Sequence, residues 1–189
     1  TMFSGQDNAL VFADAGPVAA LRPKLLRLAD RVCTQLHRAG YPYCPGGIMA
    51  ANPSWCLSLG EWKQRFCTWI AEATPQSILE INVFFDIRCV HGENALVREL
   101  QEHVRQLCSN HPGFFLHHAR RSLATRLPAL RRHGEDTLNI KDCLHPLESF
   151  ARLYALRHGV NAPSTLGRLQ ALQEGGVLAE KTVKEMTVV

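Results

Sequence analysis

The pattern of apolar and polar positions divides the first part of the chain into a strand, a helix, a loop and a second helix. Residues 7–13 turn apolar after a polar start and predict a strand, which the turn-forming DAGP at 14–17 ends. Residues 17–40 place apolar side chains at helical spacing, and Gly40 is a common helix stop. The Pro- and Gly-rich stretch that follows predicts a loop with a short strand at 48–51, and residues 58–73 predict a second helix.

A second strand is predicted at residues 78–90, ILEINVFFDIRCV, which are strongly apolar. Side chains alternate across a strand, so one face is expected to be wholly apolar and the other to carry the polar groups. Asp86 falls on that polar face, which would meet either solvent or a cleft.

Beyond residue 93 the periodicity is helical, with runs at 94–109, 113–127, 143–158 and 164–174. We therefore expect an α/β domain over residues 1–92, followed by an all-helical domain over residues 93–189.

Composition narrows the class of protein. The chain has 189 residues and is 46% apolar, enough for a sizeable core. A formal net charge of +4, without a dense run of Lys and Arg, argues against a nucleic-acid partner. No apolar run approaches the ~20 residues of a membrane span. Seven cysteines without a CxxC motif indicate reduced thiols, so we expect a cytoplasmic protein.

Two carboxylates are candidates for a metal site. Asp7 stands at the start of the first strand and Asp86 lies within the second, and neighbouring strands would hold such groups rigidly. Mg²⁺ prefers hard oxygen ligands, usually a few carboxylates together with substrate phosphates. A third carboxylate is expected two residues before Asp7, where the chain has Gly5. The alternative is structural, with Asp7 capping a turn and Asp86 pairing with Arg88.

Three further features have both a functional and a structural interpretation. Gly46 and Gly47 allow close backbone approach to a phosphate or a base, or simply form a tight connection. Gln6 and Asn8 either hydrogen-bond a nucleotide or hold the end of the strand. The stretch CSNHPGFFLHH, residues 108–118, suggests a zinc site, although its spacing lacks a paired motif.

Taken in order, four segments resemble a known family: QDNALVFAD, then GYPYCPGGIMAANPSW, then INVFFDIRCVHG, then DTLNIKDCLHPLESFARLYALRHGV with STLGRLQAL. This set is similar to the DUF294-type nucleotidyltransferases, relatives of the uridylyltransferase that modifies the PII protein. They occur in bacterial signal-transduction proteins, downstream of cyclic-nucleotide-binding and CBS domains.

The resemblance implies an α+β fold of the polymerase-beta superfamily, a small mixed sheet flanked by helices and followed by a helical bundle. It implies transfer of a nucleoside monophosphate from ATP or UTP to a hydroxyl of a signalling protein, with Mg²⁺ as cofactor. Asp7 matches the second metal-binding aspartate of the family and Asp86 the third. Lys141 matches a basic position that would approach a phosphate.

Two departures from the family pattern bear on activity. Gly5 stands where the family has its first metal-binding aspartate. The Gly-Ser segment that precedes the first strand and grips the triphosphate does not occur before Gly5, so we expect a fragment with impaired activity. The alternative function is a catalytically degenerate regulatory or interaction module of a signal-transduction protein.

Overall fold

The computed structural model of the chain describes residues 5–124 and 140–188. Two compact units make up the fold. The first comprises Thr1–Phe66 and Arg88–His103, and the second comprises Cys67–Ile87 and Val104–Val189. The division of the sequence at residue 92 stays a prediction.

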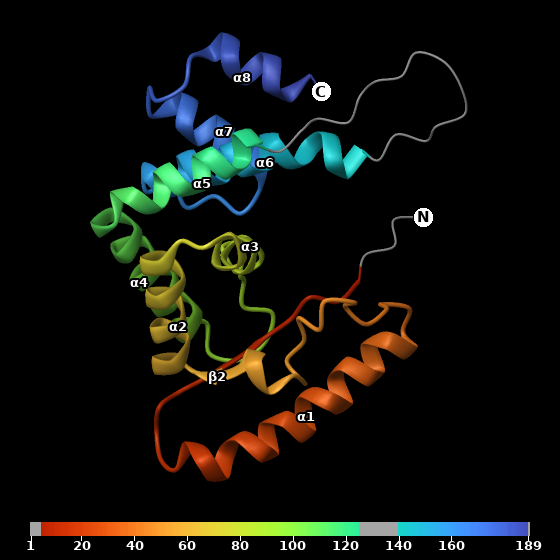
Figure 1. The fold of residues 1–189 in the computed structure, drawn as a ribbon. Helices are drawn as coiled ribbons and strands as arrows, with labels where there is room; N and C mark the ends of the chain where they lie inside the picture. The colour runs from red at the N-terminus through yellow and green to blue at the C-terminus, as the bar shows by residue number, and fades with distance from the viewer. Residues whose placement is uncertain (1–4, 125–139, 189) are drawn as a thin grey trace. The chain divides into compact units, whose positions relative to one another are not determined.

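A parallel pair of strands forms the centre of the first unit. Strand β1 spans Leu10–Phe12 and pairs in parallel with β2, Cys56–Ser58, so that Leu10 lies opposite Cys56. Helix α1, Val18–Arg38, connects the two strands and packs against β2 (Figure 1). A short 3-10 helix, Pro53–Trp55, leads directly into β2. The unit is therefore a small β-α-β arrangement, in which a helix is the usual connection between parallel strands.

Helix α2, Leu59–Glu72, begins immediately after β2. Its Trp62 and Phe66 lie four residues apart on one helical face, and both are only 1% exposed. Trp55 stacks near Trp62, with ring centroids 6.1 Å apart. This aromatic cluster is a major part of the unit's core. The other buried apolar residues of β1, α1 and β2 are Phe12, Ala29, Cys33, Cys56 and Leu57.

The first strand is confirmed in part, and the short strand predicted at 48–51 is wrong. Leu10–Phe12 is extended and paired, and Gln6 forms an isolated parallel bridge with Tyr43. Residues 49–52 instead make a turn, in which the amide of Asn52 donates to the carbonyl of Met49 at 2.8 Å. The second strand lies further on, at 56–58, where all three side chains are buried.

The strand predicted at 78–90 is also wrong. Residues Pro75–Phe84 form helix α3, and the chain then turns at Asp86. Thr74 caps the helix by accepting from the amide of Ser77, and a proline follows at the first helical position. Periodicity alone does not separate a buried strand from a buried helix in a short apolar run. Here the cap and the proline favour the helix.

In consequence, the expected alternation of faces is replaced by helical spacing. Ile81 and Phe84, three residues apart, are both buried at 0% and 4% exposure. Phe84 stacks on Trp69 of α2, with ring centroids 5.9 Å apart. Asp86 therefore lies beyond the end of a helix, and Asp7 and Asp86 are not on neighbouring strands of one sheet.

The later helices agree with the periodicity. They are α4, Asn94–Asn110; α5, Pro112–Ala124; α6, Ile140–Arg157; and α7, Thr165–Glu174. The predicted helix 113–127 extends beyond the described residues at its end. A further helix, α8, Glu180–Thr187, was not expected. Its Val183 packs with Ala151 and Leu169 in a core that joins α6, α7 and α8.

The described chain is mostly helical with a two-stranded sheet, consistent with the predicted α+β class. The sheet formed by the described residues is parallel where a mixed one was expected. Among the helices that the structure describes, none combines the length and the apolar character that crossing a bilayer requires.

Candidate functional site

The segment Gln6–Asn8 enters the first unit just before β1. Gln6 is buried at 6% exposure, and its backbone amide donates to the carbonyl of Pro42 at 3.0 Å. Its side-chain amide donates to the carbonyls of Cys33 at 2.9 Å and Tyr41 at 3.2 Å. These bonds tie the strand entry to α1 and to the loop that follows it.

Asn8 continues the same inward-facing network. Its Nδ2 donates to Oε1 of Gln6 at 3.2 Å, and its Oδ1 accepts from the amide of Ala50 at 2.8 Å. The thiol of Cys33 approaches the same Oδ1 at 3.5 Å. The two amide side chains thus hold the strand end, as the structural interpretation expects, and their contact with a nucleotide stays a prediction.

Asp7 points the other way, because side chains alternate along an extended chain. It is exposed, and within residues 5–124 and 140–188 it has no hydrogen bond or ion pair. The hydrogen-bonded side chains of Gln6, which is buried, and Asn8, which is half-buried, fix the backbone of Asp7 while its carboxylate stays in solvent. A carboxylate held in this way is available to a ligand without first losing a protein partner.

Gly5 precedes Asp7 by two residues in the same extended segment. A Cβ built on Gly5 would meet the carbonyl oxygen of Pro42 at 3.6 Å, an ordinary van der Waals separation. Gly5 is itself exposed. A side chain is therefore sterically acceptable at the position where the resembled family has its first aspartate.

The two glycines of the predicted phosphate-approach loop form a tight turn. The amide of Gly47 donates to the carbonyl of Cys44 at 3.0 Å, and the backbone of Gly47 has a φ of +68°, which favours glycine. Asn52 donates from Nδ2 to the carbonyl of Gly47 at 3.1 Å. Gly46 is exposed at the tip of this turn. The N–H of Gly47 is thus engaged, and a role for either glycine in binding stays a prediction.

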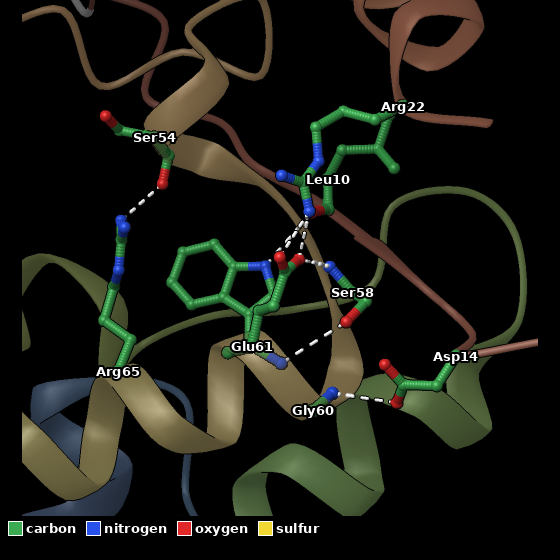
Figure 2. A network of polar contacts seen from close by, with 9 residues as sticks. Leu10, Asp14, Arg22, Ser54, Ser58, Gly60, Glu61 and Arg65 are labelled. Atoms are coloured by element: carbon green, nitrogen blue, oxygen red, sulfur yellow. Dashed lines mark hydrogen bonds and ion pairs between the residues drawn. The ribbon is translucent and has the colours of Figure 1, made fainter. Parts of the chain in front are cut away.

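A polar network at the start of α2 supports this part of the unit (Figure 2). Ser58 and Glu61 form a capping box: the amide of Ser58 donates to Glu61 Oε2 at 2.8 Å, and the amide of Glu61 donates to Ser58 Oγ at 3.3 Å. Arg22 of α1 pairs with both oxygens of Glu61. Asp14, just after β1, accepts from the amide of Gly60 at 2.9 Å. Together these contacts tie α1 and the end of β1 to the start of α2.

The same region contains an aromatic and cationic contact. Trp62 donates from Nε1 to the carbonyl of Leu10 at 3.0 Å, which ties α2 to β1. Arg65 lies over the ring of Trp55, with its Cζ 5.1 Å from the ring centroid. The guanidinium of Arg65 also donates to the carbonyl of Ser54 (Figure 2). Burial tends to raise the pKa of Glu61, but hydrogen bonds from Ser58 and Arg22 outweigh it and hold that pKa below its ordinary value.

Asp86 belongs to the second unit, where two arginines hold it. Arg152 of α6 donates to Oδ2 from Nη2 at 2.7 Å and from Nε at 3.2 Å. Arg168 of α7 pairs with the other oxygen, Oδ1. Burial would raise the pKa of Asp86, yet the bonds from Arg168 and Arg152 lower it. Asp86 therefore pairs with arginines from distant helices, and not with its neighbour Arg88 among the described interactions.

Sequence reasoning missed both arginines. Arg168 lies in the first turn of α7, which Ser164 caps by accepting from the amide of Gly167 at 3.1 Å. The STLGR motif therefore signals the helix start that positions Arg168. Arg168 is 7% exposed, and a buried cation on an amphipathic helix is a signal that it has a charged partner.

The remaining candidates are Lys141 and the stretch suggested for zinc. Lys141 is in the first turn of α6, and its side chain lies outside the described residues. In the stretch suggested for zinc, His118 Nε2 donates to Oδ1 of Asn82 at 2.9 Å and His111 bonds the carbonyl of Leu107. No group of three or more His, Cys, Asp or Glu side chains suited to a metal occurs in the described part of the chain.

Comparison with known protein families matches both halves of the chain. The model of the putative nucleotidyltransferase DUF294 matches residues 1–76, and that of the putative nucleotidyltransferase substrate binding domain matches residues 116–188. These matches support a nucleotidyltransferase family. The first contains Asp7 and the glycine turn, the second contains Lys141 and both arginines, and Asp86 lies between them. Neither the curated proteins nor the solved structures gave a match.

Taken together, the two matches support a nucleotidyltransferase-like function. They agree with the residue pattern just before β1, where the exposed Asp7 stands between the buried Gln6 and the half-buried Asn8. The family descriptions do not specify the nucleotide, the acceptor or the metal.

Proposed function

We propose that this chain is a nucleotidyltransferase-like module that binds ATP or UTP together with Mg²⁺, and that its activity is impaired. The observation that carries the proposal is Asp7, an exposed carboxylate between the hydrogen-bonded Gln6 and Asn8, in the segment before β1 that the nucleotidyltransferase family model matches. The reaction is transfer of the nucleoside monophosphate to a hydroxyl of a protein that takes part in signalling.

The metal requirement is met in part by the residues present. Asp7 has the hard oxygen donors that Mg²⁺ prefers, and no described partner competes for them. Asp86 is the second expected ligand, and it is paired with two arginines. Mg²⁺ held by the carboxylate of Asp7 would neutralise charge on the triphosphate.

In this transfer the acceptor hydroxyl oxygen forms a bond to the α-phosphorus. The bond from that phosphorus to the bridging oxygen breaks, and pyrophosphate leaves. The hydroxyl proton passes to a carboxylate, for which Asp86 is the expected acceptor once released from its arginines. Asp7 contributes by orienting the nucleotide, because the bonds of Gln6 and Asn8 keep its backbone fixed.

A regulatory module without catalysis is the second candidate, and two observations favour it. Gly5 replaces the first expected carboxylate, and Asp86 is already engaged in ion pairs. Under this alternative the chain keeps the fold, binds nucleotide weakly or not at all, and acts by binding a partner. An aspartate at position 5 would then not restore transfer.

The replacement Gly5→Asp tests both candidates. Its Cβ has room, and its carboxylate would lie on the same side of the extended segment as Asp7. The proposal expects Mg²⁺-dependent binding of ATP or UTP to tighten by about tenfold, equivalent to roughly 1.4 kcal/mol. Calorimetric titration measures this change, and labelled-nucleotide transfer is assayed in parallel.

Gly113→Asp is the matched control, because Gly113 has open space around its Cβ and lies in α5, in the other unit. It adds the same charge in the other unit. Equal affinities for the two variants and the natural chain would contradict the nucleotidyltransferase proposal and favour the module without catalysis.

A further inference from the structure

The pairing of Asp86 with two arginines has an unusual charge balance. One carboxylate faces two guanidinium groups, so the cluster carries a surplus positive charge. The side chain of Arg168 is 9% exposed and that of Arg152 is 16% exposed. Among the described residues, Asp86 is the only carboxylate paired with either arginine. Because burial makes an unbalanced cation costly, this site favours an anion with more charge than one carboxylate.

The two arginines are fixed by the helices that carry them. Arg152 follows Ala151, which is fully buried, and Arg168 precedes Leu169, which is 2% exposed. Ala151 and Leu169 pack in one core, so the α6 and α7 backbones are held at the points where the arginines leave them. The guanidinium pair is therefore pre-organised, which lowers the ordering cost of binding an anion.

Asp86 reaches the arginines from a different element. It follows the end of α3, in a turn, and is not part of α6 or α7. Its side chain is 32% exposed, more than either arginine. A turn residue can be withdrawn without disturbing the core between α6 and α7. Asp86 is thus suited to occupy the arginine pair in the absence of a ligand and to leave when a stronger anion arrives.

We propose that Arg152 and Arg168 form an anion-binding site for the phosphates of the nucleotide, and that Asp86 is an internal competitor for that site. Guanidinium groups bind phosphate oxygens with paired hydrogen bonds, and a phosphate offers more charge and more acceptor oxygens than a carboxylate. Both arginines lie within the segment matched by the substrate binding domain, and Asp86 lies outside it.

This inference rests on the proposed function, because it takes the anion to be the triphosphate of the nucleotide. It also connects the two roles of Asp86. Phosphate binding at the arginines releases the carboxylate, which then becomes available for the metal or for the acceptor hydroxyl.

The test is calorimetric titration of tripolyphosphate into the full chain in EDTA at fixed ionic strength. Asp86→Asn removes the competing charge while keeping the shape of the side chain. We expect it to tighten tripolyphosphate binding by about tenfold, because the anion no longer has to displace a charged partner from the arginines. Adding Arg152→Gln to this variant should abolish the gain.

Arg157→Gln is the matched control, because Arg157 is on the same helix and contacts the ring of Phe115 instead of Asp86. In the Asp86→Asn background it should leave the gain intact. The inference is overturned if Asp86→Asn binds no tighter than the natural chain, or if Arg152→Gln and Arg157→Gln have the same effect. If Asp86→Asn does not fold, the two arginine variants are compared with Asp86 present, and equal affinities overturn the inference.

Failure of the proposed function gives a different result. With Mg²⁺, Asp86→Asn should weaken the metal-dependent binding of ATP or UTP, the opposite of its effect on tripolyphosphate without metal. Absence of metal-dependent nucleotide binding with an intact response to tripolyphosphate refutes the proposed function and retains the anion site at the arginines.

Discussion

Asp7 and Glu61 lie in the same compact unit and meet different surroundings. Glu61 accepts hydrogen bonds from the amide of Ser58 and from Arg22, so its charge stabilises the start of α2. Asp7 is exposed, and the described chain supplies it with no donor. The carboxylate of Glu61 is therefore committed to the fold, and the carboxylate of Asp7 is available to a ligand. We propose both properties for Asp86, because a phosphate can take its place at the two arginines.

The first prediction concerns Glu61→Gln. The amide keeps one hydrogen-bond acceptor but loses the charge that faces Arg22. A capping box also forms with glutamine, and because the side chain of Glu61 is 41% exposed, solvent screens the ion pair that is lost. We expect the free energy of unfolding to fall by roughly 0.5 kcal/mol, measured by urea denaturation at pH 7.

Glu72→Gln, at the exposed end of the same helix, is the control and should change stability little. The pKa of Glu61 is lowered in the folded state, so its contribution is present above the ordinary value of 4.5. That contribution is lost as pH falls through the lower folded-state pKa. The gap between Glu61→Gln and the natural chain should therefore close in acid. A gap that widens below pH 4.5 would contradict this account.

The second prediction concerns His118, which is 1% exposed. Burial lowers the pKa of His118 to about 4, and the nearby cations Arg152 and His145 act in the same direction. The unfolded chain therefore takes up a proton at a pH where the folded chain does not. Stability should fall as pH decreases from about 6.5 to about 4, with a total loss on the order of 3 kcal/mol.

His118→Gln keeps a donor for the Oδ1 of Asn82 and removes the titrating group. It should be less stable at pH 7 but should show a flatter stability profile between pH 6.5 and pH 4. Urea denaturation across this range measures both chains. Parallel profiles would show that the pKa of His118 is not depressed in the folded state.

At the scale of elements, α3 shows how a cap decides between helix and strand. The run after Thr74 is apolar enough for a helix or a strand, and its polar residues at alternate positions favour a strand with one polar face. Thr74 accepts from the amide of Ser77 at 3.1 Å, and the proline after it needs no amide partner in a first turn. The helix then buries Ile81 and Phe84 on one side.

The third prediction concerns this cap. Thr74→Ala removes the acceptor for the amide of Ser77, and we expect the free energy of unfolding to fall by about 1 kcal/mol. Thr74→Ser keeps the hydroxyl and should be close to neutral. Urea denaturation compares the two variants, and amide exchange at Ser77 should accelerate only in the alanine variant. Equal stabilities would show that the hydroxyl does not cap α3.

The elements differ in how much of their structure sequence could predict. Helices α4 to α7 follow from periodicity, because each buries one face over several turns. Strand β2 has three residues and no alternation, since all of its side chains are buried. The apolar pattern therefore does not locate it, and predicts a strand at 48–51 instead. Helix α8 is short, and its position depends on a tertiary contact of Val183.

At the scale of the whole chain, the two family matches cover different parts of the proposed chemistry. The first contains the exposed Asp7, and the second contains the arginine pair. The sequence identified Asp7 and Asp86 because carboxylates are conspicuous in apolar runs. It did not identify Arg152 and Arg168, because a pairing over 66 and 82 residues depends on how the helices pack and not on local spacing.

The most direct test of the account is calorimetric titration of ATP and UTP, with Mg²⁺, into the natural chain and its Asp7→Asn variant. Asp30→Asn, on an exposed position of α1, is the control for loss of one charge. The account predicts weak Mg²⁺-dependent binding of at least one nucleotide, reduced by about tenfold or more in Asp7→Asn and retained in Asp30→Asn. Metal-dependent binding that survives in Asp7→Asn, or no binding by the natural chain, would contradict the assignment of Asp7 to a nucleotide site.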